Sequence, residues 1–264
     1  CADAPLVLFY KGSLEDSDTR NIAIVGTRKA TEVGKKRVDT LLHELAGAGY
    51  HPNIISGLAY GIDITAHTAC VHYGLKAQAV LGHGLHMVYP ASHKNMAEKI
   101  LEQGGALISE FPTCAQILPT NFLQRNRIVA GMSEAILVAE SPVKGGAMST
   151  ARQALSYNRD VMAIPGRPED STFSGCNLLI KQNIAALVEN VKDLLRILNW
   201  PPLPTEPYQM SLDLFPVTNN EVLIMETLAK MGEQNIDQLH QLTRIPVHDL
   251  SVLLLKLELE GRVM

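Results

Sequence analysis

Six short runs of β-branched and apolar residues recur along the first part of the chain, and each is followed by glycine or polar residues. They cover residues 22–26, 53–56, 78–81, 106–109, 135–139 and 161–164. Helical patterns lie between them, for example over residues 35–48, with an apolar stripe from Val38 to Leu45, and over residues 149–157. Buried strands that alternate with helices are typical of a parallel sheet covered by helices on both faces. The sequence therefore predicts an α/β fold.

The loops that follow these predicted strands are the expected location of the functional surface. In a parallel α/β sheet the carboxyl ends of the strands lie at one edge, and ligands bind in the crevice there. The loops after residues 26, 55, 81, 109, 140 and 164 should share this edge.

A cluster of prolines divides the chain. Positions 201, 202, 204 and 207 are proline, and such a stretch cannot continue a helix. We predict a main domain over residues 1–200, a proline-rich linker over residues 201–217 and a small helical domain over residues 218–264.

The small domain contains three predicted helices. Residues 221–229 and 235–242 have helical patterns, and Pro246 opens a third helix. Three short helices joined by a tight turn favour a helix-turn-helix or winged-helix-like domain. The chain stops at Val263 and Met264, where a wing strand would begin, so we expect this domain to be incomplete.

The composition favours a soluble, cytoplasmic protein. No run of about 18 uncharged apolar residues is present, and the first residues lack the basic-then-apolar pattern of a secretory signal. The cysteines at positions 1, 70, 114 and 176 are scattered without a C-x-x-C pair, which favours free thiols in a reducing compartment. We expect no membrane span, no metal and no cofactor.

The charge is unevenly divided along the chain, whose net charge is -4. Residues 201–264 hold 4 Lys/Arg against 9 Asp/Glu, whereas residues 20–37 hold six basic residues against Glu32 alone. The basic segment is either a phosphate-facing patch or a solvated helix face. The acidic small domain is a poor match for duplex DNA, so we expect it to contact protein instead.

Three strand-to-helix loops combine glycine with residues suited to phosphate. Glycine lets a ligand approach the backbone, the N–H groups at a helix start attract anions, and arginine supplies a planar charged fork. The alternative is that these loops are ordinary strand-to-helix turns. The residues in question are Arg28 after the first strand, Ser56 and Gly57 after the second, and Lys144, Gly145 and Gly146 after the fifth.

A fourth segment pairs arginines with an aromatic residue. Arg125 and Arg127 can neutralise a nucleic-acid backbone, and Phe122, about one helical turn earlier, offers a stacking platform for an unpaired base. The alternative is that the arginines pair with carbonyl groups or with Glu110 inside the protein. If they bind a strand, replacing both by alanine should weaken strand binding and leave the fold intact.

Several short motifs follow one another in a specific order over residues 5–200. They are Gly26-Thr27-Arg28, Ser56-Gly57-Leu58-Ala59-Tyr60-Gly61-Ile62-Asp63 with Ala66-His67, Tyr89-Pro90, Ser109-Glu110, Arg125-Asn126-Arg127, Gly145-Gly146 with Thr150-Ala151, Pro165-Gly166 and Gly175-Cys176-Asn177. In this order they resemble the DprA/Smf family, DNA-processing protein A.

The resemblance implies an extended Rossmann-like sheet and a homodimer without catalytic activity. It also implies that the protein binds and protects incoming single-stranded DNA and loads the RecA recombinase onto it during natural transformation. Family members often have Ser-Gly-Ser where this chain has Gly145-Gly146-Ala147, so a hydroxyl contact is missing there. The resemblance assigns strand-binding roles to Arg28, Ser56, Gly57, Phe122, Arg125, Arg127 and Lys144.

A nucleoside-phosphate-processing enzyme on a related Rossmann-like fold is the main alternative. That class needs a Pro-Gly-Gly-x-Gly-Thr loop, whereas Pro165-Gly166-Arg167-Pro168 lacks the further glycines. Glu110 and Glu140, at strand ends, are the only plausible acid–base candidates. A dehydrogenase is disfavoured because the Gly82-His83-Gly84 segment has only two of the three fingerprint glycines. His83 and His86 lack a third metal ligand nearby.

Overall fold

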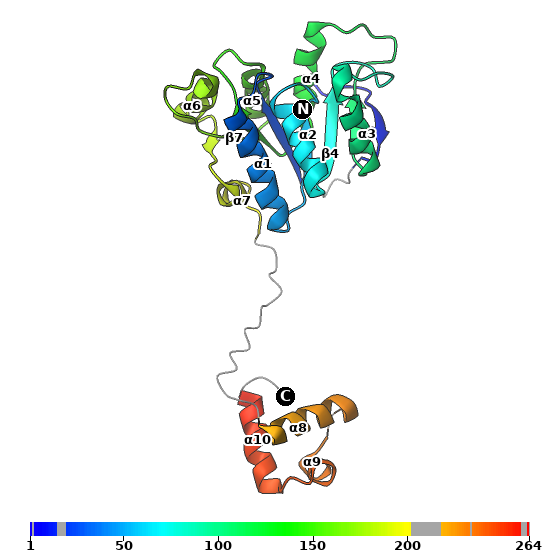
Figure 1. Cartoon of the computed structure of the whole chain (residues 1–264), viewed down its shortest axis with the longest axis vertical. Coiled ribbons are helices and arrows are strands. Elements are labelled where there is room, and N and C mark those ends of the chain that lie inside the picture. The colour runs from blue at the N-terminus through cyan, green and yellow to red at the C-terminus, as the bar shows by residue number, and fades with distance from the viewer. Residues whose placement is uncertain (2, 15–19, 202–217, 233, 260–262, 264) are drawn as a thin grey trace. The chain divides into compact units, whose positions relative to one another are not determined.

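A computed structural model describes residues 1, 3–14, 20–201, 218–232, 234–259 and 263 of the chain. Its contacts divide the chain into two units, Cys1–Leu203 and Pro204–Met264 (Figure 1). Nearly all of the predicted linker, and most of the segment where a wing strand would begin, lie outside the described residues.

The first unit is built on an eight-stranded sheet in the order β1-β5-β4-β3-β2-β6-β7-β8. All neighbouring strands are parallel except β1, which runs antiparallel to β5. The predicted α/β fold is confirmed, and the six predicted strands are present to within one residue at each end. The strands are β1 (Phe9–Gly12), β2 (Asn21–Gly26), β3 (Asn53–Ser56), β4 (Ala77–Leu81), β5 (Ala106–Ser109), β6 (Ala135–Glu140), β7 (Asp160–Ala163) and β8 (Ala186–Leu187).

The two strands that the sequence pattern missed lie at the edges of the sheet. All four residues of β1 are exposed, and β8 contains only two residues. An edge strand is not covered on both sides, so it does not need the apolar run by which the inner strands were recognised.

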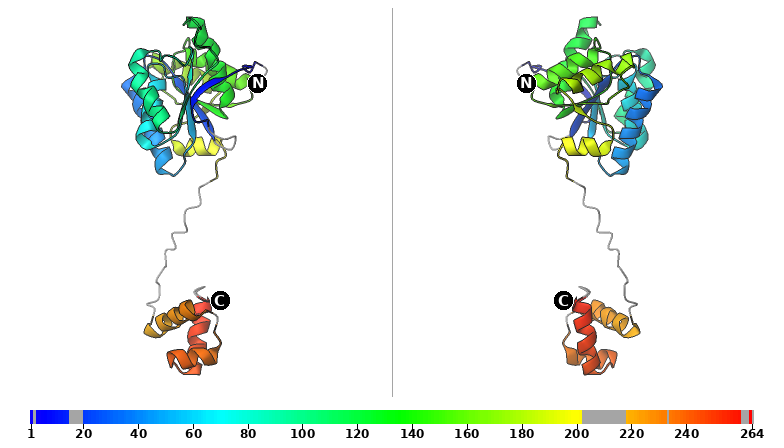
Figure 2. Two further views of the ribbon diagram at one scale, coloured as in Figure 1. Left: turned by 90° about the vertical axis from the view of Figure 1, so that its right-hand side faces the viewer. Right: turned by 90° about the vertical axis from the view of Figure 1, so that its left-hand side faces the viewer.

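Helices cover both faces of the sheet (Figure 2). Strand β2 explains the two layers, because Ile22 and Ile24 pack on one side while Ala23 and Val25 pack on the other. The first layer contains α1 (Glu32–Gly47), α2 (Ile62–Tyr73), α3 (Lys94–Glu102) and α7 (Val191–Ile197); the second contains α4 (Pro119–Met132), α5 (Gly146–Ser156) and α6 (Ser174–Lys181). Two 3-10 turns, η1 (Ala91–His93) and η2 (Ser171–Phe173), precede α3 and α6.

The order in which the chain adds strands to the sheet reverses between β2 and β6. From β2 the chain adds β3, β4 and β5 on one side, and then returns to place β6 on the other side of β2. Loops after two such strands diverge to opposite faces and leave a crevice at the strands' carboxyl ends. The loop that follows Gly26 and the loop that follows Glu140 therefore border the expected binding position.

The second unit consists of α8 (Asn219–Met231), α9 (Ile236–Thr243) and α10 (Val247–Leu259), so the three predicted helices are present. Capping boxes begin α8 and α9. No strand occurs among the described residues of this unit, and its winged-helix character stays a prediction. Its core is formed by Ile224, Leu239, Ile245, Leu250 and Leu257.

Candidate nucleic-acid interface

A cleft of about 390 Å³ opens at the carboxyl end of β2, bordered by the loop before α2, by α4 and by the start of α5. The fold thus brings residues from four separate segments to one place. Ser56, Arg127 and Lys144 do not line the cleft. The other residues assigned to strand binding from the sequence do line it, namely Arg28, Gly57, Phe122, Arg125, Gly145 and Gly146.

Arg125 lies at the base of this cleft, with only 4% of its surface exposed. Its Nη1 donates a hydrogen bond to the carbonyl of Val80, near the end of β4. Gly57 packs against the guanidinium group, because a Cβ at that position would overlap it. Burial lowers the pKa of Arg125, and the carboxylate of Asp63 opposes this shift. One nearby negative charge therefore balances the buried cation.

Asp63, in the first turn of α2, is the buried carboxylate that provides this balance. Burial raises the pKa of its carboxyl group, while the charge of Arg125 and hydrogen bonds from the loop lower it. The N–H of Ala59 donates to Oδ2 at 3.4 Å. This N–H therefore points toward Asp63 inside the protein.

Two other predicted site residues also form internal contacts. The hydroxyl of Ser56 is fully buried and donates to the carbonyl of Ile24 at 2.6 Å. Arg127 Nη2 lies 2.5 Å from Glu110 Oε2, with side-chain exposures of 15% and 9%. Both residues support the loops around the cleft, and the Arg127 contact is the alternative that the sequence analysis left open.

An aromatic wall borders the cleft on the side of α4. The ring of Phe122 lies beneath Arg28, whose Cζ is 5.4 Å from the ring centroid, within cation–π range. The ring of Tyr89, from the loop after β4, lies beside that of Phe122 with a centroid distance of 5.8 Å. Gly82 leaves room for Phe122, because a Cβ there would lie 2.9 Å from the Phe122 ring.

The start of α5 provides the opposite wall. Its N-cap residue, Gly145, makes no side-chain capping bond, and Gly146 has open space where a side chain would lie. Ala147 also lines the cleft. Unpaired N–H groups and the helix dipole make such a helix start attractive to an anion.

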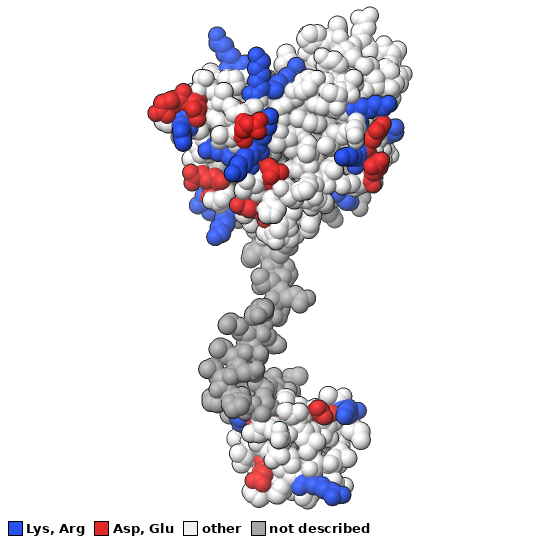
Figure 3. Space-filling view, in the orientation of Figure 1, with Lys and Arg blue, Asp and Glu red and all other residues white. Residues whose placement is uncertain are grey.

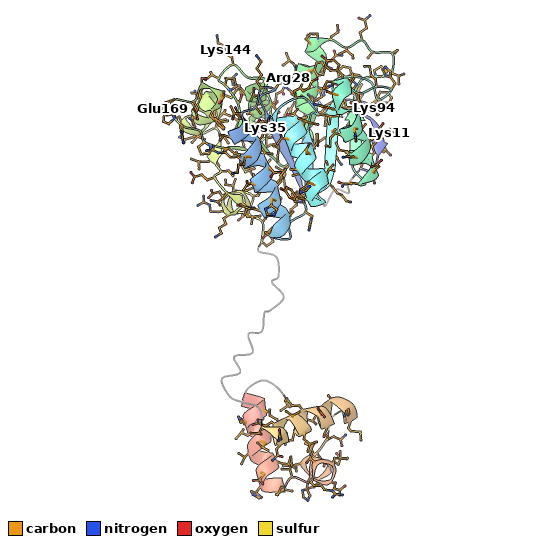
Figure 4. All side chains as sticks on the ribbon, in the orientation of Figure 1. Lys11, Arg28, Lys35, Lys94, Lys144 and Glu169 are labelled. Carbon is orange, nitrogen blue, oxygen red and sulfur yellow. The ribbon has the colours of Figure 1, made fainter. Side chains whose placement is uncertain are left out.

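Positive charge gathers at the same edge. Arg28 and Lys144 are both exposed, and Figure 4 shows them at the upper edge of the unit, where the strands end. Figure 3 shows Lys and Arg side chains projecting from this edge, whereas acidic residues lie lower on the same face. Lys144 can therefore attract a phosphate backbone at the rim without lining the cleft itself.

Comparisons with known proteins identify the family. The family model for DNA recombination-mediator protein A matches residues 1–199. The chain belongs to the DNA recombination-mediator protein A family. It is 37% identical to protein Smf of Escherichia coli over 98% of this chain and 69% of that protein. It is 38% identical to the DNA processing protein DprA of Streptococcus pneumoniae over 73% of this chain and 67% of that protein.

Solved structures of this DprA/Smf family have the same fold. The crystal structure of DprA from Streptococcus pneumoniae is similar with a TM-score of 0.68 at 37% identity, over 74% of this chain and 67% of that one. A DprA structure from Helicobacter pylori, described for its single-stranded DNA binding mode, gives a TM-score of 0.66 at 30% identity, over 75% of this chain and 89% of that one. The predicted resemblance to DprA/Smf is confirmed.

Internal contacts engage both carboxylates that were considered for catalysis, Glu140 and Glu110. Glu140 is fully buried and accepts hydrogen bonds from the N–H of Thr31 at 3.0 Å and from its hydroxyl at 3.2 Å. Glu110 pairs with Arg127. Neither carboxylate lines the cleft.

Of the two histidines considered for a metal, His83 has a structural role. His83 Nε2 accepts the N–H of Tyr89 at 3.1 Å, and burial lowers the pKa of His83, which keeps the ring neutral. Within the described part of the chain, no group of three or more His, Cys, Asp or Glu residues is placed to hold a metal ion. In the same part, every helix is too short or too polar to cross a membrane.

The sequence analysis missed three contributions to this site. Asp63 was quoted only within a family motif, and its charge balance with Arg125 depends on α4 folding beneath the loop. Tyr89 was quoted only as part of a family motif, and Tyr60 likewise. Both lie beside Phe122 in a small recess of the interface. The feature of the sequence that could have indicated these two residues is an aromatic side chain in a loop that follows a predicted strand.

Proposed function

We propose that this chain binds single-stranded DNA in the cleft at the β2–β6 switch point. The observation that carries the proposal is the combination of Arg28 with Phe122 on one wall and the uncapped start of α5 on the other. A cation and a helix start suit phosphates, and an aromatic face suits an unpaired base. Duplex DNA keeps its base faces stacked, so the aromatic wall favours a single strand.

The binding we propose is driven mainly by phosphate contacts. Arg28 and Lys144 attract the backbone, and Gly145 and Gly146 allow it to approach the start of α5. Arg125 and Asp63 hold the base of the cleft, and Gly57 lets Arg125 occupy that position. Ser56 and Arg127 do not line the cleft. We propose that they contribute to binding indirectly, by supporting the segments around it. Binding should therefore be indifferent to base sequence and weakened by salt.

We propose that this binding is not coupled to catalysis. Glu110 and Glu140 are engaged by Arg127 and Thr31, and neither faces the cleft. The relatives' names, DNA processing protein and recombination mediator, agree with a DNA-handling role. On the same family basis we propose a cytoplasmic homodimer that loads RecA onto incoming strands during natural transformation, with the helical unit as a protein-contact module.

The experiment that tests strand binding is fluorescence anisotropy of labelled oligo-dT at two salt concentrations, with duplex DNA, ATP and NAD as competitors. Tight, salt-sensitive binding that neither nucleotide displaces is expected. Displacement or consumption of a nucleotide would instead favour the nucleoside-phosphate-processing enzyme. RecA loading is tested separately, by the rate of RecA filament formation on strands already covered by single-strand binding protein.

A further inference from the structure

A second, smaller recess adjoins the main cleft. It measures about 100 Å³ and shares Arg28, Gly57, Ala59 and Phe122 with the larger one. Tyr60, Tyr89 and Pro90 complete its lining. The recess therefore continues the interface beyond Phe122 without including the start of α5, and two of its three additional residues are aromatic.

Both tyrosines expose about half of their surface in spite of their size. Tyr60 is 51% exposed and Tyr89 is 48% exposed. They come from different loops, Tyr60 from the loop before α2 and Tyr89 from the loop after β4. The ring of Tyr89 is tilted by 46° to that of Phe122, so neither ring fully covers the other. Aromatic surface is therefore available to a planar ligand.

Two buried histidines fix the loops that carry these rings. His83 accepts the backbone N–H of Tyr89 at 3.1 Å, and its Nδ1 donates to the carbonyl of Gly84 at 3.0 Å. His93 lies against Tyr60 in an edge-on arrangement, with ring centroids 4.8 Å apart. The same histidine bonds through Nδ1 to the carbonyl of Leu58 at 2.8 Å. The loops that carry the two exposed tyrosine rings are thus held in place by hydrogen bonds and a ring contact with buried histidines.

We propose that Tyr60 and Tyr89 form a second base-stacking subsite, which takes the nucleobase next to the one that stacks on Phe122. The proposal rests on strand binding in the main cleft. Its chemistry is specific for a planar, unpaired base: the recess offers aromatic faces and the neighbouring Arg28 offers a cation, whereas no carboxylate lines it. Stacking of this kind tolerates any base, since every base has a π face.

The test compares variants on intact strands and on strands that lack one base. The Tyr60→Ala, Tyr89→Ala double variant should bind oligo-dT about 5- to 100-fold more weakly than the wild type, the range expected for one lost stacking contact. The affinity of the wild type should fall by the same factor when the strand carries an abasic site at the one position whose base would enter the recess. The double alanine variant should bind the intact strand and the strand with this abasic site equally well.

Three controls separate stacking from general damage. Tyr60→Phe, Tyr89→Phe keeps both rings and should keep wild-type affinity. Tyr10→Ala, which removes an equally exposed tyrosine from β1, should also leave affinity unchanged. The salt dependence of binding should be the same for the double alanine variant and the wild type, because no phosphate contact is lost.

The outcomes separate this proposal from the proposed function. If the wild type does not bind oligo-dT, strand binding fails and the subsite with it. If the wild type binds and the double alanine variant binds equally well, only the subsite is refuted. An abasic penalty that persists unchanged in the double alanine variant refutes it too, since the base would then be recognised elsewhere.

Discussion

Gly57 lies so close to Arg125 that a Cβ at position 57 would overlap the guanidinium group. The loop after β3 and the helix α4 are far apart in the sequence, and this contact holds them together at the base of the cleft. Glycine is required at position 57 because the buried side chain of Arg125, which comes from α4, occupies the space that a Cβ would need. Arg125 is in turn held by the Val80 carbonyl and balanced by Asp63.

Replacing Gly57 by alanine should displace Arg125 and distort the cleft. We expect strand affinity to fall by at least about tenfold and the melting temperature to drop, because overpacking of a tight contact costs about 1–3 kcal/mol. Anisotropy and differential scanning calorimetry measure the two effects. Gly47→Ala is the matched control, since a Cβ at that exposed position of α1 has no atom within 4 Å. Equal behaviour of the two variants would contradict the proposed contact.

Arg28 and Arg125 should respond differently to substitution by alanine. Arg28 is exposed, so Arg28→Ala should weaken strand binding at an unchanged melting temperature. Arg125→Ala leaves Asp63 buried without the nearby charge that lowers the pKa of its carboxyl group, so the substitution should destabilise the protein. Arg125→Ala should therefore lower the melting temperature, whereas the sequence alone predicted an intact fold. Thermal unfolding of both variants decides the matter, and an Arg125→Ala protein as stable as the wild type would refute the charge balance.

Arg127 and Glu110 should depend on each other for stability. Each single substitution, Arg127→Gln or Glu110→Gln, leaves one partner of the pair without its counter-charge and should destabilise the protein. The double variant should be more stable than the sum of the two losses predicts. A double-mutant cycle in urea measures this coupling free energy, and additive losses would show that the pair contributes nothing.

Lys144 should act on strand binding through charge alone. Lys144→Ala should lower affinity for all base sequences and reduce the slope of log K against log salt by about 1, as expected for one lost phosphate contact. Binding measured from low to high salt gives this slope. Lys181→Ala, an exposed lysine at the end of α6, should leave the slope unchanged. If both variants keep the wild-type slope, Lys144 does not contact the strand.

Glu221 should make the helical unit sensitive to acid. Its side chain accepts from Lys256 Nζ at 2.7 Å and from the N–H of Thr218 at 2.6 Å, and these contacts lower its pKa to about 2. A lowered pKa stabilises the folded state above the usual value of 4.5, and this contribution is lost as the pH falls toward 2. An NMR titration of the Glu221 carboxyl group in the whole chain measures the shift. Glu221→Gln should remove this pH dependence, and a carboxyl that titrates near 4.5 would contradict it.

The inner strands, the helices between them and the edge where the cleft opens could be predicted from the amino-acid sequence. These features depend on local periodicity and on glycine at strand ends, and both are visible in one segment at a time. The family motifs also pointed to Arg28, Phe122 and the start of α5, which the fold brings together around one cleft.

Which polar residues face the cleft and which face the protein interior became visible only once the helices were packed on the sheet. A motif does not reveal that Arg125 lies beneath Gly57, or that Arg127 pairs with Glu110. The edge strand β1 and the recess of Tyr60 and Tyr89 likewise depend on neighbours far away in the sequence. The burial and pairing of a charged or aromatic side chain depend on the elements packed around it, whereas the spacing of residues along the chain predicts only the element that carries it.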